Sequence, residues 1–179
     1  MKFLMTINIL LLALTFSSCD IVKYTSTHQP MAKYYRFSSD TSQRDISILD
    51  TTHIYVLGQD LVRTYRNGKI EKFYGYTFFK FSSKGLAFYS ATTEEKPNAS
   101  NIYTNNGQCC FYKMLDNEIR LEFYDYHLKR FTIAYFRVYP DKLIMYKDKL
   151  RVWWGGKSKY NNAYIKSDIV YTRQLQFPE

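Results

Sequence analysis

Short runs of alternating hydrophobic and polar residues dominate the chain after about residue 33. The clearest run is 118–126, where Ile119, Leu121 and Phe123 alternate with charged or hydroxylated neighbours. A period of two is typical of a strand with one buried and one wetter face. No useful length of sequence after Cys19 repeats with the period of an amphipathic helix. The pattern therefore predicts an all-β domain.

Turn signals between these runs predict which strands pair. Asn67-Gly68 favours a tight hairpin because both residues accept positive φ, and Ser82 to Gly85, Asp116-Asn117 and Pro140-Asp141 mark further turns. An exposed loop is expected over 92–107, and 157–162 is polar and basic. We expect strands over 33–37, 46–49, 53–57, 61–65, 69–74, 76–81, 86–91, 108–115, 118–126, 128–139, 142–147, 150–154 and 164–173. Sequential neighbours with short connections predict an antiparallel up-and-down meander of about 8–10 strands, closed into a barrel or strongly curved.

A different pattern occupies the first eighteen residues. Lys2 precedes an apolar run over 3–14, and small residues follow it, an order typical of a secretory signal peptide. The run is too short to span a bilayer. Ser17-Ser18-Cys19 resembles a bacterial lipobox, which implies cleavage before Cys19, diacylglycerol on its thiol and an acyl chain such as palmitate on its amine. The alternative is an ordinary signal peptide that leaves Cys19 as a free thiol.

The remaining composition predicts one domain without a disulfide framework. Residues 19–33 are polar and irregular and predict a tether, and 34–179 then form a single β domain. The 18 Tyr and 13 Phe residues favour strands and exclude a disordered chain. Cys109 and Cys110 are adjacent, so on a strand one packs in the core and the other faces the second surface.

Three segments carry a resemblance to a known family. The hairpin 76–90, the run 107–122 and the turn 139–144 are similar in order and spacing to the β-meander of lipocalin-like lipoproteins of Bacteroidetes-type bacteria. The resemblance covers roughly residues 70–173. It implies a lipocalin-like barrel in the bacterial cell envelope, held by its lipid at the outer membrane. Secreted proteins of such bacteria carry O-glycans on Asp-Ser/Thr motifs, so Asp50-Thr51-Thr52 implies a glycan on Thr51.

Inward-facing residues of the meander are the candidate ligand-binding residues. A barrel of about eight strands either fills with its own side chains or leaves room for one small ligand. For a small apolar ligand or an envelope component, we expect a lining of Phe79, Phe81, Phe88, Tyr112, Met114, Leu121, Phe123 and Met145, with Ile119 and Leu143 also pointing inward. If these large side chains fill the interior, no ligand binds there.

The basic C-terminal third is the alternative interaction surface. The chain has a formal net charge of +9, and lysines and aromatics interleave after residue 141. Trp153, Trp154, Lys157 and Lys159 are the candidate contacts, and the chain would then be an accessory envelope lipoprotein that docks on a protein or a polyanion. Nucleic acid is less favoured because envelope partners are nearer at hand.

Catalytic chemistry has little support in the sequence. There is no phosphate-binding loop, no His-Glu-x-x-His and no nucleophile elbow. His53 near Asp50 and His127 near Asp125 each place one histidine beside one carboxylate, an arrangement that is common in turns. We therefore expect a protein without enzymatic activity, with no catalytic residue, metal or cofactor.

Overall fold

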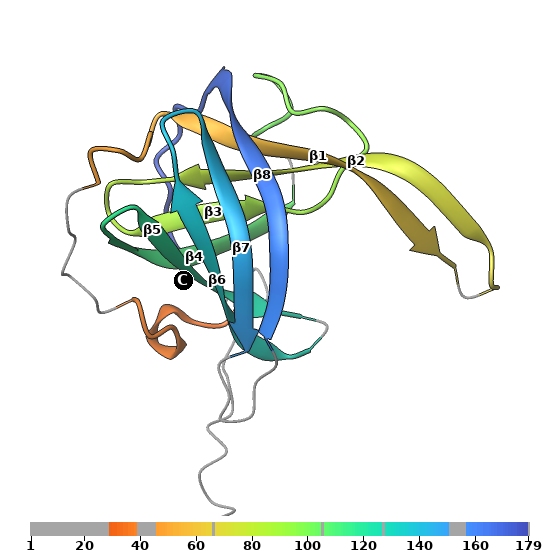
Figure 1. Cartoon of the computed structure of the whole chain (residues 1–179), viewed down its shortest axis with the longest axis horizontal. Coiled ribbons are helices and arrows are strands. Elements are labelled where there is room, and N and C mark those ends of the chain that lie inside the picture. The colour runs from red at the N-terminus through yellow and green to blue at the C-terminus, as the bar shows by residue number, and fades with distance from the viewer. Residues whose placement is uncertain are drawn as a thin grey trace, which may run out of the picture.

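The computed structural model describes residues 29–38, 46–65, 67–104, 106–126, 128–150 and 157–178. Within these ranges, eight antiparallel strands follow one another around a closed barrel (Figure 1). They are β1 (His53–Thr64), β2 (Ile70–Phe81), β3 (Leu86–Ser90), β4 (Gly107–Leu115), β5 (Glu118–Asp125), β6 (Arg130–Val138), β7 (Lys142–Leu150) and β8 (Lys157–Val170). β8 pairs with β1 and closes the sheet. The predicted all-β, up-and-down meander is confirmed, as are the turns at 82–85, 116–117 and 140–141.

Two pairs of predicted strands are single long strands. β1 continues through Gly58, and β2 continues through Gly75. A Cβ at Gly58 would lie 2.8 Å from the Tyr74 ring, and a Cβ at Gly75 would lie 2.5 Å from the Leu61 side chain. The glycines therefore permit close packing within a strand and do not interrupt it. β8 likewise begins at Lys157, because pairing with β7 overrides the polar composition of 157–162.

The N-terminal part differs most from expectation. Neither 33–37 nor 46–49 is a strand. Residues Ala32–Tyr34 form a short 3-10 helix, η1, and Leu49 in the 46–49 turn packs into the barrel interior. Gln29 and Pro30 are buried, so the predicted tether does not extend to residue 33. Short-range alternation cannot separate a strand from a segment that packs irregularly on a sheet. In the described residues no helix is long and apolar enough to cross a membrane.

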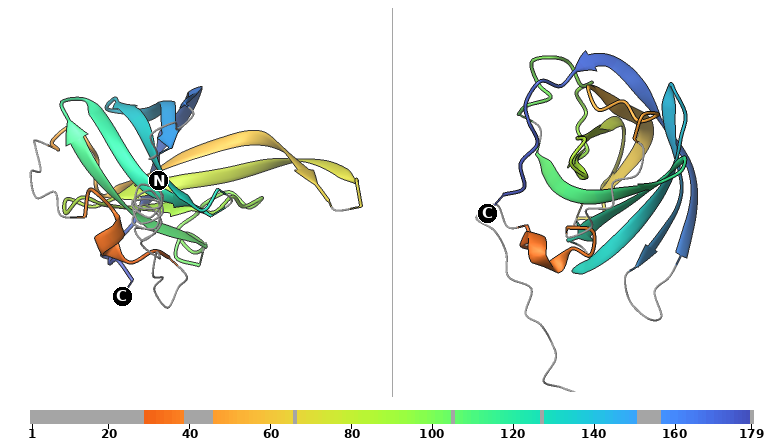
Figure 2. Two further views of the ribbon diagram at one scale, coloured as in Figure 1. Left: turned by 90° about the horizontal axis from the view of Figure 1, so that it is seen from below. Right: turned by 90° about the vertical axis from the view of Figure 1, so that its left-hand side faces the viewer.

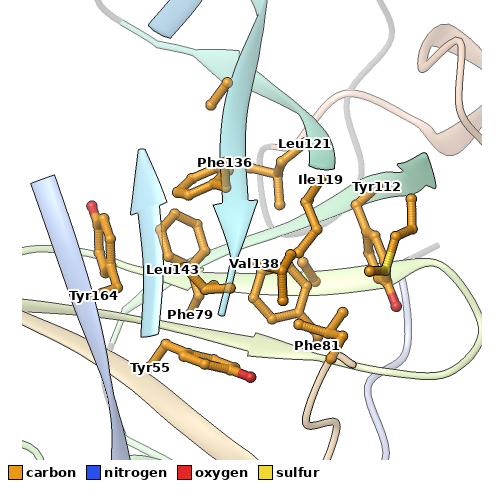
Figure 3. Packing of buried hydrophobic residues seen from close by; sticks show 14 of the residues in the cluster. Tyr55, Phe79, Phe81, Tyr112, Ile119, Leu121, Phe136, Val138, Leu143 and Tyr164 are labelled. Carbon is orange, nitrogen blue, oxygen red and sulfur yellow. The ribbon is translucent and has the colours of Figure 1, made fainter. Parts of the chain in front are cut away.

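Large side chains fill the barrel interior (Figure 3). Phe79 of β2 contacts Phe136 of β6, with ring centroids 5.2 Å apart, and Tyr164 of β8 at 4.8 Å. Two further clusters lie on the outside of the sheet. One joins Tyr35 to Phe177, so that the N-terminal segment and the C-terminal tail lie side by side (Figure 2). The other joins β1 and β2 to the 91–106 loop through Ile54, Phe78 and Ile102.

β1 and β2 continue beyond the barrel as a two-stranded projection (Figures 1 and 2). β1 pairs with β8 only as far as Val56, and β2 pairs with β3 only from Phe79. The β1–β2 register nevertheless continues outward to Thr64 and Ile70. We call residues 57–64 and 70–77 the arm. Its only third backbone partner in the described residues is a bridge between Tyr76 and Thr93.

Candidate functional site

A cavity of about 430 Å³ opens at one end of the barrel, where β3 and β5 end and β4 begins. Its lining comprises Tyr89 and Ala91, Gly107 and Gln108, and residues 123–126. We call it the mouth cavity. The rings of Tyr89 and Phe123 lie 6.3 Å apart at its base and pack on the interior cluster. The volume lies in the range of small-molecule sites, which are about 300–1,000 Å³.

A side-chain clamp fixes the rim of the mouth cavity. The Gln108 side-chain amide donates to the Tyr124 carbonyl at 3.2 Å, and the Tyr124 backbone amide donates to Gln108 Oε1 at 3.4 Å. Gln29 reaches the same rim, because its Nε2 donates to the Gly107 carbonyl at 3.4 Å and its Oε1 accepts from the Cys109 amide at 3.1 Å. The rim is therefore built from strand ends and from the first described residue of the chain.

The predicted ligand-binding residues divide into three groups. Buried in the interior cluster are Phe79, Phe81, Tyr112, Met114 and Leu121, together with Ile119 and Leu143. Phe123 and Met145 pack against that cluster and are partly buried. Phe123 alone among the predicted residues also lines the mouth cavity. The buried group fills the space that a ligand inside the barrel would need.

The inward orientation expected for Phe88 is wrong. β2 and β3 pair Phe79 with Tyr89 and Lys80 with Phe88. Directly opposed residues of antiparallel strands share a face, so Tyr89 points inward and Phe88 outward. Phe88 packs on Phe78 in the outer cluster, with ring centroids 5.8 Å apart. Alternation along 86–90 does not show which face is inside when both faces of a strand are covered.

Sequence reasoning missed most of the mouth cavity. Tyr89, Gln108 and Tyr126 line it but do not stand out in the sequence. In the sequence, Asp125 is notable only because it is near His127. His127 lies outside the described residues. The cavity forms where three strand ends meet across the sheet, and this meeting depends on register and closure.

Asp50 and His53 do lie together, at the opposite end of the barrel. His53 Nδ1 lies 2.8 Å from Asp50 Oδ2, and Thr52 Oγ1 lies 2.8 Å from the same nitrogen. A nucleophile–base–acid relay needs its hydroxyl and its carboxylate on different ring nitrogens. Partial burial raises the pKa of Asp50, but hydrogen bonds from Thr52 and His53 outweigh it and hold the pKa well below its usual range. The group is a hydrogen-bonded turn.

Lys80 is the most deeply buried amine of this region. It is 3% exposed, and its Nζ donates to the Thr51 carbonyl and lies 5.7 Å from the centroid of the Tyr171 ring. Burial lowers the pKa of Lys80 to about 8. Thr51 itself is half-buried in this turn, and a glycan on it stays a prediction.

The two described cysteines face opposite sides of β4, as their adjacency in the sequence predicts. Cys110 is buried in the interior cluster, whereas the thiol of Cys109 faces outward and lies 3.3 Å from the Gln176 carbonyl. Burial raises the pKa of the Cys109 thiol to about 11, so it is protonated at neutral pH. Neither cysteine is in a disulfide. No group of three potential ligands for a metal ion occurs among the described residues.

The basic surface is described only in part. Trp153 and Trp154 lie outside the described residues, as do the leader and Cys19. The backbone of β8 is described, and its register sets Lys159 opposite Lys147 and Lys157 opposite Lys149.

Comparison with known proteins gives no relative. No protein-family model, no curated protein and no solved structure matches the chain. The chain is therefore classified by its fold alone. It is an eight-stranded up-and-down β-barrel with a cavity at its mouth.

Proposed function

We propose that this chain is a lipid-anchored protein of the bacterial envelope that binds a small apolar ligand at the mouth of its barrel. The mouth cavity is the observation that carries the proposal, because the interior itself is filled. The sequence of the leader and Cys19 supports the anchor, and the resemblance to lipocalin-like lipoproteins agrees with it. The role is binding, not catalysis.

The lining of the mouth cavity limits the ligand chemistry. Tyr89, Phe123 and the ring of Tyr126 offer apolar and aromatic surface. Among the described residues that line the cavity, Asp125 is the one charged side chain, and none is a lysine or an arginine. An anionic group would be desolvated there without a counter-charge, which is costly. The ligand is therefore apolar, and its polar end is neutral or cationic.

A residue that fills the mouth cavity tests this function. Ala91 is exposed at the rim, so Ala91→Trp occupies the cavity without entering the packed interior. The neutral fluorophore N-phenyl-1-naphthylamine should bind the wild-type protein saturably, and Ala91→Trp should weaken binding by at least about tenfold. Ala99→Trp, at an exposed position of the 91–106 loop, is the matched control and should bind normally. Equal binding by both variants would remove the mouth cavity as the site.

The anchor has its own test. An inhibitor of lipoprotein signal peptidase should cause a lipidated precursor that retains residues 1–18 to accumulate in the host. Mass spectrometry of the processed protein should find acyl chains on Cys19. A mature N-terminus with a free Cys19 thiol would instead establish the ordinary signal peptide.

The opposed lysines of β7 and β8 favour a second candidate function, that of an accessory protein that docks on an acidic envelope partner. Two like-charged pairs in direct register carry this candidate. The charge reversals Lys157→Glu and Lys159→Glu should lower the salt concentration that elutes the protein from heparin. Lys84→Glu with Lys96→Glu changes the net charge equally at exposed positions elsewhere. The same shift in both double variants would mean that only net charge matters.

A further inference from the structure

The arm has two unlike faces. On one face, Arg63 lies over the Phe73 ring at 4.5 Å and pairs with Glu94 at 3.1 Å. On the other, the register sets Val62 opposite Lys72, Thr64 opposite Ile70 and Asp60 opposite Tyr74. Val62, Ile70 and Tyr74 are 61%, 64% and 50% exposed. We call this second face the apolar–basic face.

The arm is a long two-stranded hairpin with little of its surface covered by other parts of the chain. Eight residues on each strand, at about 3.4 Å per residue, span about 24 Å. A two-stranded hairpin is marginally stable in water unless a third strand or another layer packs on it. In the described part of the chain, the Tyr76–Thr93 bridge is the only backbone partner of the arm, and Glu94 of the same loop pairs with Arg63 on the first face. The apolar–basic face thus lacks a layer that its three exposed apolar side chains would need.

The charges of the arm indicate what kind of surface covers the apolar–basic face. Residues 57–77 contain four arginines or lysines and two carboxylates, Asp60 and Glu71, so the arm together with its tip has a formal charge of +2. Asp60 lies on the same face as Lys72. Glu71 lies 3.8 Å from Arg63 on the opposite face. No described carboxylate forms an ion pair with Lys69 or Lys72, and Lys69 lies 5.5 Å from the Tyr65 ring near the tip. Exposed apolar residues flanked by Tyr and Lys are typical of segments that lie in a membrane interface.

The position of the arm at one end of the barrel is consistent with contact with a membrane. The arm begins at the barrel end that carries the mouth cavity, because β2 leaves its pairing with β3 at Phe79 and Tyr89. Gln29 contacts the rim of the same cavity. Cys19 precedes it by ten residues, which span at most about 35 Å. Lys149 and Lys157 form the last described pair of β7 and β8 at this same end.

We infer that the arm docks on an anionic lipid surface through its apolar–basic face, with the mouth of the barrel turned toward that surface. The orientation rests in part on the proposed anchor at Cys19, whereas the arm contact stands on its own exposed residues. The mouth cavity would then open toward the membrane from which an apolar ligand could be drawn.

Hydrogen–deuterium exchange on the full processed protein tests the arm directly. The probes are vesicles of pure phosphatidylcholine and vesicles in which about a quarter of the lipid is phosphatidylglycerol. Amides of the arm should exchange at least about fivefold more slowly with the anionic vesicles. Val62→Ser with Ile70→Ser, or Lys72→Glu alone, should abolish this protection. The matched controls, Ile48→Ser and Lys84→Glu, alter exposed residues at the opposite end of the barrel and should keep it.

The readouts separate this inference from the anchor. Mass spectrometry of the same sample reports whether Cys19 is acylated. Acylated protein that sediments with vesicles but shows no protection of the arm overturns the docking inference and leaves the anchor intact. Protection that appears without vesicles and grows with protein concentration also overturns it, because the arm would then cover a second copy of the chain.

Discussion

Phe79 and Phe136 meet edge to face across the barrel, from strands that are four apart in the meander, with ring centroids 5.2 Å apart at 78°. The contact closes the interior, because Phe79 also lies 4.8 Å from both Tyr164 and Tyr89. A barrel of about eight strands is just narrow enough for side chains from opposite walls to touch. The interior is therefore filled by side chains, and the mouth cavity lies where Tyr89 and Phe123 end this packing.

Truncation of Phe79 should be the most destabilising change tested in the barrel. Phe79→Ala should lower the free energy of unfolding by about 3–5 kcal/mol, because it removes ring contacts to three strands and leaves a cavity. Urea denaturation followed by fluorescence measures the loss. Tyr74→Ala, on the exposed face of the arm, should cost less than about 1 kcal/mol and serves as the control. A similar cost for both would mean that the interior is loosely packed.

The sequence predicts the meander because each strand of its second half is short, alternating and closed by a turn such as Asp116-Asn117. It does not predict the arm, since Gly58 and Gly75 interrupt the hydrophobic pattern and their role depends on rings and side chains from the neighbouring strand. Alternation places Phe88 on the wrong face because both faces of β3 are covered. The mouth cavity depends on which strand ends meet, and that is a property of register and closure.

Gly107 is required at the rim of the mouth cavity. A Cβ there would lie 2.2 Å from the Tyr89 carbonyl oxygen and 2.9 Å from the Ser90 Cα, which are backbone atoms of the paired strand. Gly107→Ala should therefore push β3 and β4 apart, cost about 1–3 kcal/mol and weaken fluorophore binding. Thermal unfolding and the binding assay measure the two effects.

Gly68→Ala is the informative comparison for Gly107→Ala. Gly68 has φ +81° in the tip of the arm, and no atom lies within 4 Å of the position that a Cβ would take. Its substitution should cost about 1 kcal/mol through backbone strain alone. Fluorophore binding should be unchanged, and a loss of binding in this variant would argue against a local role for the Gly107 rim.

Glu122 holds the N-terminal segment against the outside of the barrel. Its side chain is fully buried, and its Oε2 accepts from the Phe37 amide at 3.1 Å. Glu122→Leu removes this hydrogen bond and leaves the part-buried Phe37 amide without that acceptor, at a cost of about 1–3 kcal/mol. Amides of 29–38 should then exchange faster with deuterium. Glu122→Gln retains an acceptor oxygen and should keep much of the protection, and equal exchange in both variants would contradict this role.

Lys80 should give the protein a distinctive pH dependence. Burial lowers the pKa of Lys80 from 10.5 to about 8 in the folded chain. Between these values the unfolded chain binds a proton that the folded chain does not, so the free energy of unfolding rises with pH. From about pH 7 to pH 10, the wild-type protein should gain about 2 kcal/mol relative to Lys80→Met. Lys84→Met, at an exposed turn, should follow the wild-type profile in urea denaturation. If the Lys80→Met and wild-type profiles run parallel over this range, the Lys80 amine titrates as if in water, and burial does not disfavour its charge.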